Sequence, residues 1–174
     1  HHAAGRSLVD WVLAAAAGAG VERTVVVVGH GGDEVRRALA GKSGLEFAVQ
    51  PEQLGTGHAV LMCRDQLRDH HGGILVLNGD TPLVRADSLA ALVAARDEAD
   101  AACVIGTART AANQGLGRVL RDDQGEFVRI VEEADATPEE ATIEEINTGS
   151  YVFDGGRLWA VLDRLQPDNR QAQY

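Results

Sequence analysis

The chain has 174 residues, 45% of them hydrophobic and 24% charged, which is enough for a buried core and excludes a disordered protein. It carries 26 acidic and 16 basic residues and no basic stripe with interleaved aromatic residues, so we expect no nucleic-acid partner. No segment is long and apolar enough to span a bilayer, and the first residues do not form a signal peptide, so we expect no membrane partner and a cytoplasmic location.

Helical and strand patterns alternate through the first part of the chain. In order, these are a helical pattern over 7–17, an apolar run over 24–28, a helical pattern over 33–39, an extended segment over 46–50, a helical pattern over 56–67, an apolar run over 74–77, a helical pattern over 87–95 and an apolar run over 101–105. After residue 107 the pattern changes to short strand signals at 118–120, 127–131 and 150–153, separated by polar loops.

The alternation indicates the fold class. Continuous apolar runs such as TVVVV and ILVL are typical of strands covered on both faces. Together with the intervening helices they predict an α/β fold with a mostly parallel, Rossmann-like mixed sheet and helices on both faces. The later strand signals predict a small α+β lobe laid over the edge of the sheet. Since no long linker separates the two parts, we expect a single domain over residues 1–174.

The two cysteines, Cys63 and Cys103, lie far apart, each in an apolar context. Neither belongs to a CxxC or Cys/His pattern of the kind that binds metals. We expect both to be reduced core thiols, with a metal or disulfide role as the alternative.

Asp80 follows the predicted strand 74–77, at the edge where ligands bind in open parallel sheets. Gly79 lets the backbone approach a ligand, and Pro82 ends the strand. A carboxylate here could bind Mg²⁺, which takes one or two protein carboxylates and completes its shell with phosphate oxygens and water. From these residues alone, the alternative is that Asp80 caps the next helix or begins a turn.

The string QPEQLGTGHA, over residues 50–59, ends an extended segment and opens a helical pattern. Thr56 would suit the N-cap of this helix, whose first turn offers unpaired backbone N–H groups. The amides of Gln50 and Gln53 add the donors and acceptors that the edge of uracil or a similar base requires. The alternative is an ordinary strand-to-helix turn with surface glutamines.

Several other polar residues have simpler interpretations. His30 and His58 have no nucleophile or metal-ligand spacing near them, so we interpret His30 as part of a glycine-rich turn and His58 as a helix-start residue. Lys42, the only lysine, lies in a polar turn with nothing to place it near phosphates. By charge alone Glu132 belongs to a solvated acidic face, and residues 137–140 are typical of a helix start with a capping box.

Five strings occur in order along the chain: QPEQLGTGHA, NGDTPL, GLGRVLRD, IVEEADAT and EINTGSYVF. In order and spacing they resemble the uridyltransferase domain of the bifunctional bacterial enzyme UDP-N-acetylglucosamine pyrophosphorylase/glucosamine-1-phosphate N-acetyltransferase. The resemblance covers nearly the whole chain. The LGTGHA string and the EINTG string with DAT are specific to this enzyme, whereas the GD element is shared among sugar nucleotidyltransferases.

The resemblance implies a set of site residues. They are Gln50, Gly55 and Thr56 for the uridine base, Asn78, Gly79 and Asp80 for the strand end beside the nucleotide, and Gly117, Glu132 and Asn147 for the sugar pocket. Asp80 would be the catalytic ligand of Mg²⁺. Asn78 departs from the family, which more often has an aromatic residue at that position.

The reaction that the resemblance implies is transfer of UMP from UTP to N-acetylglucosamine 1-phosphate. The products are pyrophosphate and UDP-N-acetylglucosamine, a precursor of the cell envelope. The sugar phosphate is already an anion near neutral pH, so no general base is required. Catalysis would consist of positioning and of neutralising phosphate charge by Mg²⁺ and cationic side chains.

The chain departs from the family pattern at both ends. The family begins with a strand, a glycine-rich LxAGxGTRM loop and a Pro-Lys pair, and it ends with a later Asn ligand of Mg²⁺ and a β-helical acetyltransferase domain. This sequence contains none of these, so we expect an incomplete domain with little or no turnover by itself. The full-length family forms homotrimers through the β-helix, and we expect this chain to be a monomer.

Two other functions stay open at this stage. One is nucleotide transfer to another sugar 1-phosphate, on the same fold. The other is a non-catalytic module that binds nucleotide sugars.

Overall fold

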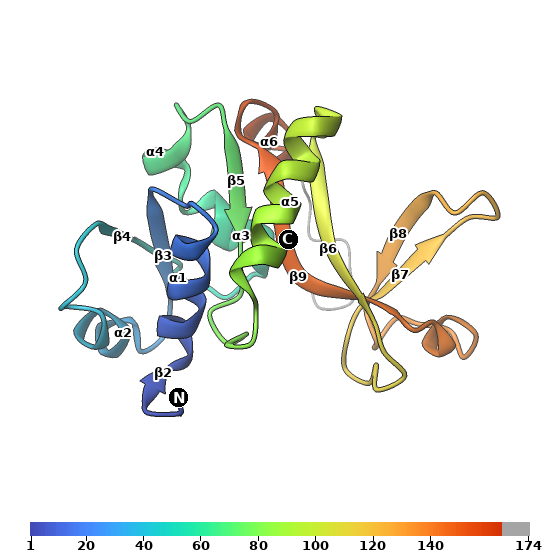
Figure 1. Ribbon diagram of the computed structural model, residues 1–174, viewed down its shortest axis with the longest axis horizontal. Helices are drawn as coiled ribbons and strands as arrows, with labels where there is room; N and C mark the ends of the chain where they lie inside the picture. The colour runs from blue at the N-terminus through green and yellow to red at the C-terminus, as the bar shows by residue number, and fades with distance from the viewer. Residues whose placement is uncertain (165–174) are drawn as a thin grey trace.

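The computed structural model describes residues 1–164, in which alternating strands and helices are followed by a strand-rich lobe (Figure 1). The helices are α1 (Leu8–Gly18), α2 (Gly32–Ala38), α3 (Thr56–Leu61), α4 (Arg64–Leu67), α5 (Ala86–Ala99), the 3₁₀ helix η1 (Glu140–Thr142) and α6 (Gly155–Leu162). The strands are β1 (His2–Ala3), β2 (Arg6–Ser7), β3 (Thr24–Val28), β4 (Leu45–Val49), β5 (Gly73–Val76), β6 (Cys103–Arg109), β7 (Arg118–Arg121), β8 (Phe127–Val131) and β9 (Glu145–Asp154). No helix in residues 1–164 has both the length and the apolar character needed to cross a membrane.

The strands form three hydrogen-bonded sheets. β1 and β2 make a short antiparallel hairpin, and β3 and β4 make a parallel pair. The largest sheet has the order β5-β9-β7-β8, with β6 also paired to β9. Leu75 of β5 and Val104 of β6 are both register partners of Val152, so β9 lies antiparallel between β5 and β6. β5 and β6 therefore run in the same direction.

The α/β class with mixed sheets is confirmed, but the prediction that the sheet is mostly parallel is wrong: in residues 1–164, β3 and β4 form the parallel ladder, and the ladders of the largest sheet are antiparallel. The difference comes from β9, which follows the small lobe in the chain and inserts antiparallel between two strands that would otherwise be neighbours. At its other end β9 pairs with β7, through Arg118 and Ile146. One strand thus joins the main sheet to the lobe formed by β7, β8 and η1, which we call the small lobe (Figure 1).

Two clusters of buried side chains hold the elements together. The first, with Val26, Val28 and Leu39 at its centre, packs α1 and α2 against β3 and β4. The second includes Val60 and Ile74 and packs α3 and α6 against β5 and β9. α5 contacts β5, β6 and β9 and lies in front of them in Figure 1, whereas α3 lies behind. Helices therefore cover both faces of the main sheet, as predicted.

Some predicted bounds differ from the observed ones. The strands at 24–28 and 127–131 have their predicted bounds, whereas the strand expected at 150–153 is part of the longer β9. The helical pattern over 56–67 is divided into α3 and α4. The division occurs because the N–H of Cys63 donates to the carbonyl oxygen of Val60, three residues back (2.9 Å), and not to that of the fourth residue back.

The expectation of two core thiols is correct for one cysteine. Cys63 is buried, and burial raises the pKa of its thiol to about 11. Cys103 is exposed, so its assignment to the core is wrong. Cys103 is the first residue of β6 and pairs with Phe153 at the end of the β6–β9 ladder. Both thiols are free.

A buried carboxylate joins the small lobe to the main sheet. Glu145, the first residue of β9, accepts two hydrogen bonds from the Arg121 guanidinium on β7 (2.9 and 2.8 Å). Arg109 of β6 approaches the same carboxylate at 3.7 Å. The pKa of Glu145 is lowered, chiefly by the hydrogen bonds from Arg121, although burial acts in the opposite direction.

Another close contact fixes the start of α6. The N–H of Gly155 donates to the carbonyl oxygen of Gly72 (2.9 Å), and a Cβ at position 155 would collide with the carbonyl oxygen of His70. Both neighbours are backbone atoms, which cannot rotate away as a side chain could. A glycine is therefore required where α6 meets the loop before β5.

We expect Glu145 to make the folded state sensitive to acid. A carboxylate with a lowered pKa stabilises the folded state above its unfolded pKa, about 4.5, and this stabilisation is lost as the pH falls through the folded pKa. Urea unfolding measured between pH 7 and pH 3 should therefore show a smaller loss of unfolding free energy for Glu145→Gln than for the unmodified chain. Glu144→Gln, at the exposed neighbouring position, is the control. Parallel curves for Glu145→Gln and the unmodified chain would contradict the prediction.

We expect Gly155→Ala to lower the free energy of unfolding by about 3 kcal/mol, because the methyl group has no space between two carbonyl oxygens. Gly41→Ala is the matched control, since a Cβ there meets no atom within 4 Å. It should change stability by less than about 1 kcal/mol. Denaturant titration of the two variants measures the difference, and equal stabilities would show that the α6 contact tolerates a side chain.

Candidate functional site

The side chain of Gln50 closes the loop that follows β4. Its Nε2 donates to the carbonyl oxygen of Gly55 (3.1 Å) and lies 3.1 Å from Nδ1 of His58. Since the amide nitrogen can only donate, Nδ1 of His58 is the acceptor in this contact. Gln50 thus uses its hydrogens within the loop and has Oε1 left to accept from a ligand. His58, interpreted as a helix-start residue, lies in the first turn of α3 and also orients Gln50.

The cap of α3 differs from the prediction. Gly55 is the N-cap, and Thr56 is the first helical residue, with no side-chain hydrogen bond at the cap. The backbone of Gly55 has φ 95°, in the region that favours glycine, so threonine would be strained at this position. Thr56 is exposed. The side-chain amide of Gln53 packs on the loop after β3, because its Nε2 would lie 3.6 Å from a Cβ placed on Gly29.

The predicted metal ligand lies in the turn after β5. Asn78, Gly79 and Asp80 are exposed, and the Thr81 hydroxyl donates to the carbonyl oxygen of Asn78 (2.8 Å). Asp80 does not cap the next helix, because the N-cap of α5 is Arg85. In the part of the chain that the structure describes, no group of three or more His, Cys, Asp or Glu side chains could hold a metal ion. Asp80 would therefore act as a single carboxylate ligand.

Asn78 packs against β9. A Cβ at Gly149 would collide with Nδ2 of Asn78, and Gly149 has φ 71°, so both the space and the backbone conformation favour glycine there. The strand end that carries Asp80 thus contacts the EINTG segment directly. No sequence pattern predicts this contact.

The three predicted sugar-pocket residues come together from separate segments. The N–H of Asn147, on β9, donates to the carbonyl oxygen of Gly117 (2.8 Å), which precedes β7. A Cβ at Gly117 would lie 3.1 Å from Oε1 of Glu132, which follows β8. Glu132 is exposed, as its charge pattern predicts, and is also a neighbour of Gly117. A backbone amide, a carboxylate and a side-chain amide therefore gather where β7, β8 and β9 meet.

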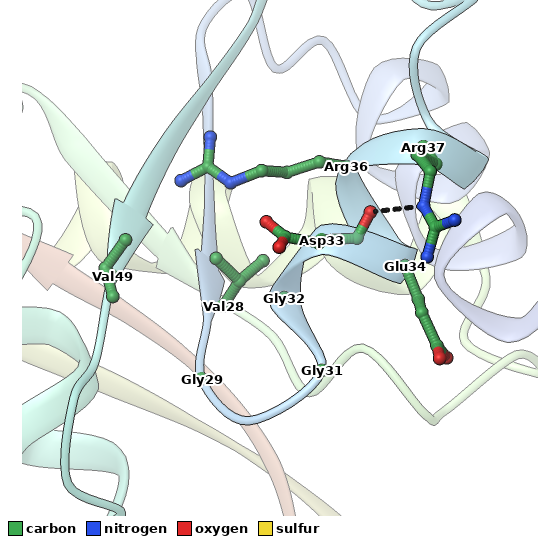
Figure 2. Close-up of a pocket in the computed structure, with 9 residues that line it drawn as sticks. All are labelled: Val28, Gly29, Gly31, Gly32, Asp33, Glu34, Arg36, Arg37 and Val49. Carbon is green, nitrogen blue, oxygen red and sulfur yellow. Dashed lines mark hydrogen bonds between the residues drawn. The ribbon is translucent and has the colours of Figure 1, made fainter.

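A hollow of about 380 Å³ lies elsewhere, where β3, α2 and β4 meet (Figure 2). None of the nine residues that line it is among the predicted site residues. Within it, Arg37 Nε donates to the carbonyl oxygen of Asp33 (3.2 Å), and the Arg36 guanidinium lies over the Phe47 ring. Gly29 lines the hollow and also lies against Gln50 and Gln53, so the hollow adjoins the Gln50 loop.

Comparison with known protein families agrees with this architecture. A family model described as the MobA-like NTP transferase domain matches residues 2–172. The chain belongs to this family.

The chain is also similar to longer proteins that are each named bifunctional protein GlmU. Those of Lactobacillus delbrueckii subsp. bulgaricus and Pelobacter propionicus are 44% identical over 174 residues, which is all of this chain and 37% and 38% of the relatives. That of Anaeromyxobacter dehalogenans is 44% identical over 177 residues, which is all of this chain and 36% of the relative. The chain thus spans somewhat more than a third of the length of these relatives. The resemblance drawn from the five sequence strings is confirmed at this level.

In this MobA-like NTP transferase domain, an ion pair on the small lobe fixes the turn before Gly117. The Arg118 side chain is almost fully buried, at 1% exposure, and its guanidinium lies 2.5 Å from Oε2 of Glu133. The same guanidinium donates to the carbonyl oxygens of Leu116 and Ala141. Glu133 Oε2 also accepts from the N–H of Gly115 (3.2 Å). Glu133 therefore holds both ends of the turn.

Sequence reasoning missed this pair. Glu133 stands in an acidic stretch that is typical of a solvated face, and its side chain is still 46% exposed. No local signal marks it, because Glu133 lies in the turn after β8 and meets Arg118 only when β7 and β8 pair. Glu132 lies against Gly117, whereas Glu133 pairs with Arg118. The hydrogen bond from Arg118 is also the largest cause of the lowered pKa of Glu133.

We expect Arg118→Met to lower the free energy of unfolding by about 2–3 kcal/mol. The reason is that two carbonyl oxygens and the Glu133 carboxylate would lose the guanidinium group that donates hydrogen bonds to them. Arg129→Met is the control, since the Arg129 side chain is 54% exposed and its pair with Glu140 lies on the surface of the same lobe. Guanidinium titration should show a small change for this control. Equal losses in the two variants would contradict a special role for the buried pair.

Proposed function

We propose that this chain is the nucleotide- and sugar-binding part of an N-acetylglucosamine-1-phosphate uridyltransferase. The observation that carries the proposal is the convergence of Gly117, Glu132 and Asn147, which come from three separate segments, beside the strand end that bears Asp80. Membership of the NTP transferase family and the similarity to GlmU proteins support the same reaction class. The substrates of the whole proteins are part of the proposal, because the chain covers 37% of such a relative.

The reaction that we propose is a displacement at phosphorus. A phosphate oxygen of N-acetylglucosamine 1-phosphate forms a bond to the α-phosphorus of UTP. The bond from that phosphorus to the oxygen that bridges to the β-phosphorus breaks, and pyrophosphate leaves with the electron pair. Since the nucleophile is already an anion, no protein group has to remove a proton. The work of the protein is to hold the two substrates in line.

The geometry supports a role for each of the proposed binding groups. Oε1 of Gln50 is suited to accept the N3–H of uracil, because the Gln50 amide nitrogen already donates within its loop. Glu132 can accept from sugar hydroxyl groups, and the Asn147 amide can both donate and accept. The backbone of Gly117 can approach the sugar closely because the residue has no side chain.

We propose that the metal is Mg²⁺, held by Asp80. A single exposed carboxylate fits an ion that takes few protein ligands and completes its shell with phosphate oxygens and water. When bound, Mg²⁺ would neutralise negative charge on the phosphates. Lys42 is not positioned to do so, since its ammonium lies 2.9 Å from Asp10 on α1. This pairing supports the expectation that turnover by the chain itself is low.

The test is binding of UTP by isothermal titration calorimetry, with and without Mg²⁺. We expect Mg²⁺ to tighten binding of UTP, and Asp80→Asn to weaken the Mg²⁺-dependent affinity by about tenfold or more. Asp87→Asn, which changes an exposed carboxylate on α5 that pairs with Arg85, should have no effect. UTP should bind better than dTTP and CTP.

Several outcomes would count against the proposal. Equal affinity for UTP, dTTP and CTP would contradict the assigned base, and equal effects of the Asp80 and Asp87 substitutions would contradict the assigned metal ligand. Release of pyrophosphate from UTP, measured with acetylated and unacetylated sugar phosphate, identifies the preferred acceptor. Binding of UDP-N-acetylglucosamine together with no Mg²⁺-dependent binding of UTP would favour the non-catalytic module, because little turnover is expected of this chain in either case.

A further inference from the structure

An irregularity in β9 brings two side chains together beside the predicted sugar residues. Tyr151 is the register partner of Ile105, and Asn147 is the partner of Thr107, so three residues of β9 lie opposite Gly106 alone. The bulge is held by the Thr148 hydroxyl, which donates to the carbonyl oxygen of Gly106 (2.7 Å). Because of the bulge, the Asn147 amide and the Tyr151 hydroxyl approach to 2.6 Å.

Both ends of the Asn147 amide are fixed by this arrangement. Its Nδ2 donates to the Tyr151 hydroxyl, and its Oδ1 accepts from the N–H of Gly149 (3.0 Å). An amide held at one end only could turn about its last side-chain bond and exchange donor for acceptor. The hydroxyl of Tyr151 therefore decides, together with Gly149, which way the donor and the acceptor of Asn147 face.

The phenol ring is itself well anchored. Tyr151 stacks on Phe153, with ring centroids 5.8 Å apart and an interplanar angle of 27°. Burial raises the pKa of Tyr151, and the negative charge of Glu132 acts in the same direction. The hydroxyl is therefore neutral at physiological pH. Of the three predicted sugar ligands, Tyr151 is thus joined to Asn147 by a hydrogen bond.

We propose that Tyr151 is a positioning residue of the sugar site, whose hydroxyl orients the Asn147 amide toward the N-acetylated sugar. The inference rests on the proposed function, because it takes the group around Asn147 to be the sugar pocket. A purely structural role would reside in the stacked ring, whereas the positioning role resides in the hydroxyl. Tyr151→Phe separates the two, since it keeps the ring against Phe153 and removes only the oxygen.

The experiment compares UDP-N-acetylglucosamine with UDP, by isothermal titration calorimetry on the full 174-residue chain. We expect Tyr151→Phe to weaken binding of UDP-N-acetylglucosamine by about five- to tenfold, the effect of one hydrogen bond, and to change binding of UDP by less than about twofold. Thr142→Val is the matched control. It removes one hydroxyl hydrogen bond elsewhere in the small lobe, to the carbonyl oxygen of Glu139 (2.7 Å), and leaves the bulge intact, so it should leave the ratio of the two affinities unchanged.

A double-mutant cycle tests whether Tyr151 acts through Asn147. In the Asn147→Ala background, Tyr151→Phe should cause no further loss of affinity for UDP-N-acetylglucosamine. The side-chain amide resonances of Asn147 should also move in Tyr151→Phe and stay in place in Thr142→Val.

The outcomes distinguish this inference from the proposed function. An unchanged affinity ratio in Tyr151→Phe, or an equal loss for both ligands, would overturn the positioning role while leaving the uridyltransferase proposal standing. Failure of the unmodified chain to bind either ligand would overturn the proposed function and the inference with it. A further loss in the double mutant would show that the hydroxyl does not act through Asn147.

Discussion

The ten residues of β9 form ladders with three different strands, and the arrangement of the molecule depends on those ladders. The C-terminal half of β9 lies between β5 and β6, and its N-terminal half pairs with β6 and β7. At the end of the strand, Asp154 accepts from the N–H of Arg157, which caps α6, and pairs with Arg96 of α5. Because one continuous backbone enters all of these contacts, a change of register in β9 would move the small lobe, α6 and the sugar residues together.

The same strand brings the two halves of the candidate site together. The turn after β5 carries Asp80, and its Asn78 packs on Gly149 of β9. Two residues before Gly149, Asn147 donates its backbone N–H to Gly117. A phosphate that links a base to a sugar must lie between the groups that recognise each of them. A direct contact between the strand end and the sugar segment therefore leaves little freedom in where that phosphate can lie.

The features of the fold and the candidate site that could be predicted are those that depend on residues close together in the sequence. Apolar runs gave β3 and β8 with their bounds, and the position of Asp80 after a buried strand followed from the order of elements. The partner of Gln50 could not be found in this way, because His58 and Gly55 become its partners only when the loop closes. The pairing of Glu133 with buried Arg118 likewise depends on how β7 and β8 lie side by side. Antiparallel insertion of β9 is a third such case, since strand direction is a property of the assembled sheet.

The net negative charge of the chain limits how anionic ligands can be bound. The chain has a net charge of −10, yet the proposed ligands are anions, so attraction between unlike charges over the whole surface cannot bring them together. Two buried or half-buried cations are already paired with carboxylates, Lys42 with Asp10 and Arg118 with Glu133. In the proposed site, neutral amides and backbone N–H groups would recognise the base and the sugar, and a divalent cation would neutralise the phosphates. Gln50, Asn147 and Asp80 are residues of these kinds.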